Sequence, residues 1–271
     1  MTLRFVLLSL LILTSYASAQ TPAAYLKSEK EVQRHDKQLT TVAESLESWL
    51  AGRLSQADFL KLLNTSKKEC AEYRTLPAEV SRSLQSQEAS LLDKISSFAS
   101  QKAPDADGQR RLFLELSRLT ESRTTRLIGW RQETLRKILA GQLTRDQHNY
   151  FRWELAWLEV WGKEANLTHR LEEAFLAEGH TDGEPQQILK SFLSLRVLAD
   201  NIACPPNLES LDSTATERLT LLTRTAEQLL RLEKRRGSGA LTKVRRLSRQ
   251  LAEITSRFQS ERLSRLEAIA K

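Results

Sequence analysis

The sequence is poor in residues that interrupt helices and in those that build β-sheets. It contains 6 Pro and 9 Gly among 271 residues, and aromatic residues make up only 6%. No segment shows the alternation of apolar and polar residues that a half-buried strand requires. These absences argue against a β fold, whereas abundant Leu, Ala, Glu, Arg and Gln favour long helices.

Cysteine occurs only twice, at Cys70 and Cys204. A metal site built on them is disfavoured, because no histidine lies within a few residues of either. In an oxidising compartment the two thiols can form a disulfide. A bridge between Cys70 and Cys204 would close a loop of more than a hundred residues and would stabilise the fold by about 4–5 kcal/mol in the chain-entropy model. We predict this bridge, with two buried free thiols as the alternative.

The sequence also lacks the short motifs of common enzymes and cofactor sites. It contains no His-Glu-x-x-His, no Cys-x-x-Cys-His, no Gly-x-Ser-x-Gly and no phosphate-binding glycine loop. The Glu-x-x-His pairs of di-iron bundles are absent too. We therefore expect no metal and no cofactor, and a non-enzymatic protein is favoured over an enzyme.

A long apolar run occurs only at the N-terminus. Arg4 precedes the apolar stretch Phe5–Leu13, and Ala17-Ser18-Ala19 resembles a cleavage site. This layout predicts a secretory signal, residues 1–19, removed before Gln20. The stretch is shorter than the roughly 20 residues of a membrane span, although an N-terminal anchor is the alternative. We expect an exported mature chain, periplasmic or secreted, without a transmembrane segment.

Apolar residues recur with the period of an α-helix along most of the chain. In the first predicted helix, apolar residues recur at steps of three and four and form a coiled-coil-like seam. Pro and Gly clusters separate eight such segments. The predicted helices cover residues 22–51, 55–74, 77–102, 107–140, 144–178, 184–203, 207–236 and 241–270. The fold class is all-α, with long antiparallel helices in hairpin or three-helix repeat units that form an elongated bundle.

One turn sequence appears three times. In Trp49–Phe59, Gly52 fits the left-handed residue that ends a helix, and Ser55 fits the N-cap of the next helix. Related sequences stand at Ala140–Thr144 and Ser238–Thr242, which predicts the same turn there.

The segment Glu44–Ser55 also aligns without gaps on Glu133–Thr144. We predict a three-helix unit at 20–104, a second at 105–206 and a basic helical hairpin at 207–271. The alternative explanation is that these segments are not repeats and resemble each other only because the same residues form good helix ends and caps.

The helix predicted at 144–178 carries a stripe of tryptophans. Trp153, Trp157 and Trp161 share one face, which is typical of a core, and a ligand groove beside them is the alternative. Glu154 falls inside this apolar face, where a carboxylate needs a partner. The arginines considered as its partner come from the preceding helix and are Arg123, Arg126 and Arg131.

Positive charge is concentrated at the C-terminal end. Residues 217–271 contain 14 Lys and Arg against 6 Asp and Glu, a net charge of +8, whereas the whole chain carries +7. An arginine-rich helix face suits phosphate or carboxylate partners. The predicted contact residues are Lys234, Arg235, Arg236, Arg245, Arg246, Arg249 and Arg257.

These observations favour an exported, envelope-associated scaffold or interaction protein that contacts an anionic partner through the basic hairpin. The partner is an anionic envelope surface or an acidic protein. Nucleic acid is disfavoured, because no aromatic residues are interleaved with the basic ones to stack on bases. The alternatives are a small-ligand carrier or enzyme that uses a groove beside Trp153, Glu154, Trp157 and Trp161, and a chain that forms homo-oligomers.

Overall fold

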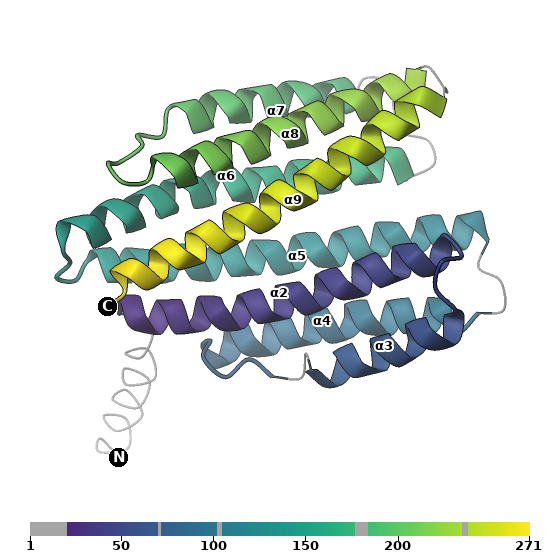
Figure 1. The fold of residues 1–271 in the computed structure, drawn as a ribbon, viewed down its shortest axis with the longest axis horizontal. Helices are drawn as coiled ribbons and strands as arrows, with labels where there is room; N and C mark the ends of the chain where they lie inside the picture. Colours follow the sequence, from purple (N-terminus) through teal and green to yellow (C-terminus); the bar gives the residue numbers. More distant parts are fainter. Residues whose placement is uncertain (1–20, 70–71, 102–104, 177–183, 235–237) are drawn as a thin grey trace, which may run out of the picture. The chain divides into compact units, whose positions relative to one another are not determined.

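The computed structural model of the protein describes residues 21–69, 72–101, 105–176, 184–234 and 238–271 (Figure 1). In these ranges every regular element is an α-helix and no strand occurs. The all-α prediction is therefore confirmed for the described part of the chain. The helices are α2 (Pro22–Leu50), α3 (Gln56–Glu69), α4 (Ala78–Ala99), α5 (Ala106–Leu139), α6 (Arg145–Leu176), α7 (Glu184–Asp200), α8 (Glu209–Lys234) and α9 (Ser238–Ile269).

The helices begin and end within a few residues of most predicted positions. The largest difference is at α3, which ends at Glu69 rather than near residue 74. In the described ranges, no helix combines the length and the apolar character that crossing a membrane requires.

The turn between α2 and α3 has the predicted chemistry. Gly52 has a φ of +70°. Its N–H donates to Trp49 O at 2.9 Å, and the N–H of Arg53 donates to Ser48 O at 2.8 Å. These two bonds form a Schellman motif, in which a left-handed residue closes the helix end. Ser55 Oγ then accepts a hydrogen bond from the Asp58 N–H at 3.1 Å, as an N-cap does.

The second turn repeats the cap, whereas the third does not form. Thr144 Oγ1 accepts from the Gln147 N–H at 3.2 Å, and Gln147 Oε1 accepts from the Thr144 N–H at 3.0 Å. This reciprocal pair is a capping box. The prediction for Ser238–Thr242 is wrong: α9 begins at Ser238, so Thr242 lies inside the helix instead of capping it. Ala240 and Leu241 are strong helix formers, and the helix therefore starts earlier.

The chain divides into two compact units, residues 1–138 and 139–271. Unit 1 contains α2 to α5, and unit 2 contains α6 to α9. The predicted boundaries near residues 104 and 206 fall inside these units, and the three-part division stays a prediction.

The core of unit 1 gathers apolar side chains from all four of its helices. Val42 of α2, Phe59 of α3, Ile95 of α4 and Leu112 of α5 belong to one buried cluster. Trp49 stacks on Phe59 with 5.2 Å between ring centroids. The apolar seam predicted for the first helix is therefore the face that α2 turns toward its neighbours.

In unit 2, α7 packs on α6 and α8, and α8 packs along α9, as Figure 1 also shows. Trp161 of α6 meets Phe258 of α9 edge to face, with 5.3 Å between ring centroids. Polar side chains also join α8 to α9. The pairs are Thr214 with Glu261, Glu217 with Arg257, and Arg218 with Thr255.

Candidate functional site

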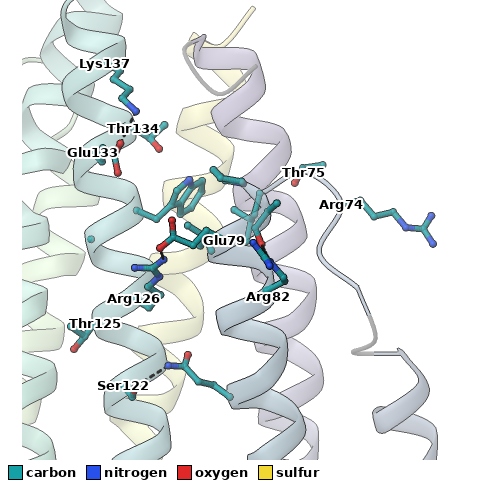
Figure 2. A pocket seen from close by; sticks show the side chains of 17 residues that line it. Arg74, Thr75, Glu79, Arg82, Ser122, Thr125, Arg126, Glu133, Thr134 and Lys137 are labelled. Atoms are coloured by element: carbon teal, nitrogen blue, oxygen red, sulfur yellow. Dashed lines mark hydrogen bonds and ion pairs between the residues drawn. The ribbon is translucent and has the colours of Figure 1, made fainter. Parts of the chain in front are cut away.

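Unit 1 contains a groove between α5 and the start of α4 (Figure 2). Its volume is about 860 Å³. One side is the segment 74–80, and the other is a stripe of α5 whose members recur at steps of three and four, the spacing of one helix face. This stripe contains Ser122, Thr125, Arg126, Gly129, Glu133 and Lys137.

The groove exists because α4 starts late and α5 is long. Gln87 donates to Ser122 at 2.8 Å and joins the two helices side by side. Arg126 pairs with Glu79, which already lies in the first turn of α4, at 2.6 Å. The α5 residues after Arg126 extend past the point where α4 begins. Figure 2 shows Glu133 and Lys137 on this extension, with Thr75 on the opposite side.

The wall opposite α5 is held in place by α2. The carboxylate of Glu31 accepts hydrogen bonds from the backbone N–H groups of Arg74 and Thr75, both at 2.8 Å, and from the Thr75 hydroxyl at 2.5 Å. Ser28 Oγ donates to Thr75 O at 3.0 Å. Burial acts to raise the pKa of Glu31, but the hydrogen bonds from Thr75 and Arg74 together lower it below its ordinary value. The loop between α3 and α4 is thus fixed to a charged carboxylate.

Three side chains that line the groove carry buried polar atoms without a hydrogen-bond partner in the structure. These atoms are Trp130 Nε1, Arg126 Nε and Gln87 Oε1. Trp130 is only 4% exposed, and its ring packs on Tyr25 with 5.8 Å between centroids. A buried donor left unpaired costs about 1–3 kcal/mol. Such atoms beside a cavity are expected where a ligand or water completes the hydrogen bonds.

Gly129 borders the groove at an exposed position of α5. It lies in the interior of the 34-residue helix α5, where glycine is about 1 kcal/mol less favourable than alanine. A Cβ atom placed on Gly129 would meet nothing within 4 Å. The packing of unit 1 therefore does not require a glycine here. The groove was not predicted from the sequence, because an isolated glycine inside a helical pattern marks an unusual helix position but does not by itself indicate a groove.

A second polar cluster of unit 1 resembles a catalytic arrangement but is closed. The carboxylate of Glu88 receives hydrogen bonds from His35 Nδ1 at 3.0 Å, from Arg123 Nε at 2.8 Å and from the Tyr73 hydroxyl. Burial acts to raise the pKa of Glu88, but the His35 hydrogen bond and the Arg123 charge outweigh it and lower the pKa. His35 and Glu88 have no exposed surface. No substrate can reach them in this conformation, so the cluster serves the fold.

Two of the three tryptophans in the stripe of unit 2 are buried, and Trp161 is partly buried. Trp153 and Trp157 are 2% and 1% exposed. Both indole N–H groups donate to Asp212 Oδ1, at 2.6 and 3.0 Å. They therefore have no free donor to offer a ligand, and a groove beside Trp153, Glu154, Trp157 and Trp161 stays a prediction.

Glu154 is fully buried, and Arg262 of α9, which was not among the arginines considered for it, is a partner. Arg262 donates to Glu154 through Nε at 2.9 Å, and also through Nη2. The arginines considered from the sequence form ion pairs inside unit 1, where Arg123 meets Glu88, Arg126 meets Glu79 and Arg131 meets Glu29.

Most of the predicted basic surface cannot be located in the structure. Arg235 and Arg236 lie outside the described residues, as do the side chains of Lys234, Arg245, Arg246 and Arg249. Arg257 is described and exposed, and it pairs with Glu217 at 2.5 Å. The hairpin contact surface is therefore neither supported nor contradicted.

The predicted disulfide is likewise untested, because Cys70 lies outside the described residues. The Cys204 side chain is exposed, and slight desolvation together with the nearby Asp212 and Glu209 carboxylates raises the pKa of its thiol. In the part of the chain that the structure describes, no group of three or more His, Cys, Asp or Glu side chains is arranged to hold a metal ion.

Comparison of the chain with known protein families, with curated proteins and with solved structures finds no match.

Proposed function

We propose that this chain is a non-enzymatic binding protein that holds a ligand in the groove of unit 1. The observation that carries the proposal is Gly129, a helix-interior glycine that the fold does not need and that borders the groove. The unpartnered Trp130 Nε1 supports it. A volume of about 860 Å³ also falls in the range of ligand sites, roughly 300–1,000 Å³.

The groove can be blocked by a substitution that the fold tolerates. In Gly129→Leu the new side chain enters the groove without a clash at its Cβ. Gly129→Ala is the matched control, because it improves the helix in the same way but fills far less space.

The test screens a panel of anionic, neutral and cationic organic molecules against the full chain by saturation-transfer NMR. We expect some members to bind the parent chain and the Gly129→Ala chain but not the Gly129→Leu chain. If every molecule that binds the parent chain also binds Gly129→Leu, the groove is not a ligand site.

A second candidate function is favoured by the charge of the sequence. The net charge of +8 in residues 217–271 supports contact with an anionic envelope surface or an acidic protein through the α8–α9 hairpin. In this proposal the chain is exported after removal of a signal near Ala19, its helices are antiparallel, and it acts as an envelope-associated scaffold. Self-association into homo-oligomers would add to its contacts.

This second function is tested by substitution rather than deletion. Removing the hairpin would leave Glu154 without Arg262 in the core of unit 2. The variant therefore carries glutamine at Arg245, Arg246 and Arg249. The matched control replaces three exposed cations of unit 1, namely Arg53, Lys61 and Lys68.

We expect the full chain to bind phosphatidylglycerol vesicles and to lose affinity as salt is added, because exposed charges are screened. The hairpin variant should bind much more weakly than the control. Equal binding by the two variants would show that the basic hairpin is not the contact surface for this membrane.

A further inference from the structure

The start of α4 brings unpaired backbone donors to the groove. The first N–H groups of a helix have no partner within the helix, and they lie at the positive end of its dipole. At α4 the N-cap position is Pro77, which makes no side-chain hydrogen bond to the helix. Ala78, Glu79 and Val80 of this first turn line the groove. An anion bound there would accept hydrogen bonds from N–H groups for which the described residues provide no acceptor.

A second, independent set of donors borders the same groove. Trp130 Nε1 and Arg126 Nε are buried and have no partner in the structure. These donors come from α5, and the free backbone groups come from α4. An acceptor group bound between the two helices could satisfy both sets, whereas a purely apolar ligand would leave them unpaired.

The charge of the lining also favours an anion. Four cations and two carboxylates line the groove, which leaves a net charge of +2. Both carboxylates pair with lining cations, Glu79 with Arg126 and Glu133 with Lys137, so the net charge is that of Arg74, which also pairs with Glu72, and Arg82. The cations are Arg74, Arg82, Arg126 and Lys137.

The rest of the lining includes apolar surface. Leu76 and Pro77 precede α4, Val80 lies in its first turn, and the Trp130 ring faces the groove from α5. We infer that the ligand is an amphiphilic carboxylate whose head group binds between the first turn of α4 and Arg126, with its apolar body against Leu76 and Val80. This inference rests on the proposed function of the groove and names its ligand class.

The inference is tested with two probes that differ only in the head group. Decanoate, below its micellar concentration, and decanol are titrated into the full chain by calorimetry. Because hydrogen bonds to charged groups are the strong ones, we expect decanoate to bind at least about tenfold more tightly than decanol. A peptide C-terminus offers the same chemistry. Acetyl-trileucine as free acid and as amide therefore forms a second pair, which shows whether the groove prefers a fatty acid or a peptide end.

Four variants separate a binding role from a structural one. Arg126→Gln should weaken decanoate binding about tenfold or more and leave decanol unchanged. Trp130→Phe, which keeps a ring but removes the N–H, should also weaken decanoate binding. Glu79→Gln releases Arg126 and should tighten decanoate binding several-fold, an effect that general loss of structure cannot produce. Arg136→Gln, an exposed α5 cation outside the groove, is the control.

Two results would overturn the ligand class. One is equal affinity for decanoate and decanol. The other is no binding of decanoate or of the free-acid peptide. The proposed function is tested separately, by whether molecules of any charge that bind the parent chain fail to bind the Gly129→Leu chain. A neutral molecule bound in the groove would keep the function and reject the carboxylate.

Discussion

Replacing Glu88 with glutamine should destabilise unit 1 without affecting unit 2. The side chain is fully buried, and its carboxylate is the shared acceptor for His35, Tyr73 and Arg123. Glutamine keeps the shape but removes the charge, and it turns an NH₂ group toward donors. The Arg123 guanidinium, at 8% exposed, would lose its buried counter-charge.

The expected cost follows from what remains after the substitution. Breaking one partner of a buried ion pair costs about 3–5 kcal/mol. Arg123 keeps an ion pair with Asp36 at 2.8 Å, but the Asp36 side chain is 41% exposed and compensates only in part. We therefore expect a loss near the lower end, about 3 kcal/mol. The control is Glu115→Gln, whose pair with Lys94 is exposed and contributes less than about 1 kcal/mol.

Hydrogen exchange is the suitable assay, because one unfolding free energy is not well defined for a chain of two units. A loss of 3 kcal/mol should speed exchange of the slowest α4 and α5 amides by about a hundredfold. Peptides of α6 and α9 should be unchanged. Exchange in α4 no faster than in the Glu115→Gln chain would refute the reasoning.

The pH dependence of the same variant gives an independent check. The folded-state pKa of Glu88 lies below its ordinary value of 4.5, because the hydrogen bond from His35 and the charge of Arg123 together outweigh burial. A lowered pKa stabilises the fold at pH values above the ordinary pKa, and this stabilisation is lost as the pH falls through the folded-state pKa. Part of the acid destabilisation of unit 1 should therefore be absent in Glu88→Gln.

Three further predictions address single residues. Gly129→Ala should stabilise unit 1 by about 0.5–1 kcal/mol, measured as slower exchange in α5, and a destabilised variant would mean that the glycine is needed for the fold. Arg262→Met should cost unit 2 about 3–5 kcal/mol, measured as faster exchange of the slowest α6 and α9 amides, because the buried Glu154 loses the counter-charge of Arg262, whereas the exposed Arg257→Met should cost less than about 1 kcal/mol. Thr144→Ala should cost about 1 kcal/mol, seen as faster exchange in the first turn of α6, and unchanged exchange there would show that the capping box does not stabilise this helix.

The helices were predictable because their ends are determined by local chemistry. Ser55 with Asp58 and Thr144 with Gln147 are pairs only three residues apart, and both form in the structure. The turn at Ser238–Thr242 was mispredicted for the same local reason. Two hydroxyl residues stand there at possible helix starts, and the helix-forming residues between them favour the longer helix. The partner of Glu154 was missed because Arg262 is 108 residues away in the sequence.

The groove was not predictable from local patterns, since it depends on how far two consecutive helices, α4 and α5, overlap along their lengths. Ser122, Thr125 and Gly129 are ordinary residues of an exposed helix face. They become a groove wall only because α4 begins opposite Arg126 while α5 continues to Leu139. Helix pairing of this kind is a tertiary property, and no motif in the sequence encodes it.

The last helices of the two units, α5 and α9, share residues at one constant spacing. The identical pairs include Arg126 and Arg257, Arg131 and Arg262, Leu135 and Leu266, and Ile138 and Ile269. Arg131 and Arg262 both pair with a buried glutamate of the first helix of their unit, Glu29 in α2 and Glu154 in α6. The shared Arg126 and Arg257 likewise pair with a glutamate of another helix of their unit, Glu79 in α4 and Glu217 in α8.

The same spacing places Ser260 of α9 at the position of Gly129, and Glu261 at the position of Trp130. These are the two groove residues whose chemistry stands out, an unneeded glycine and a buried, unpaired indole N–H. Arg126, by contrast, recurs in α9 as Arg257, so a cation at this position is common to both units. Substitution of Gly129 and Trp130 therefore tests what is particular to the groove of unit 1.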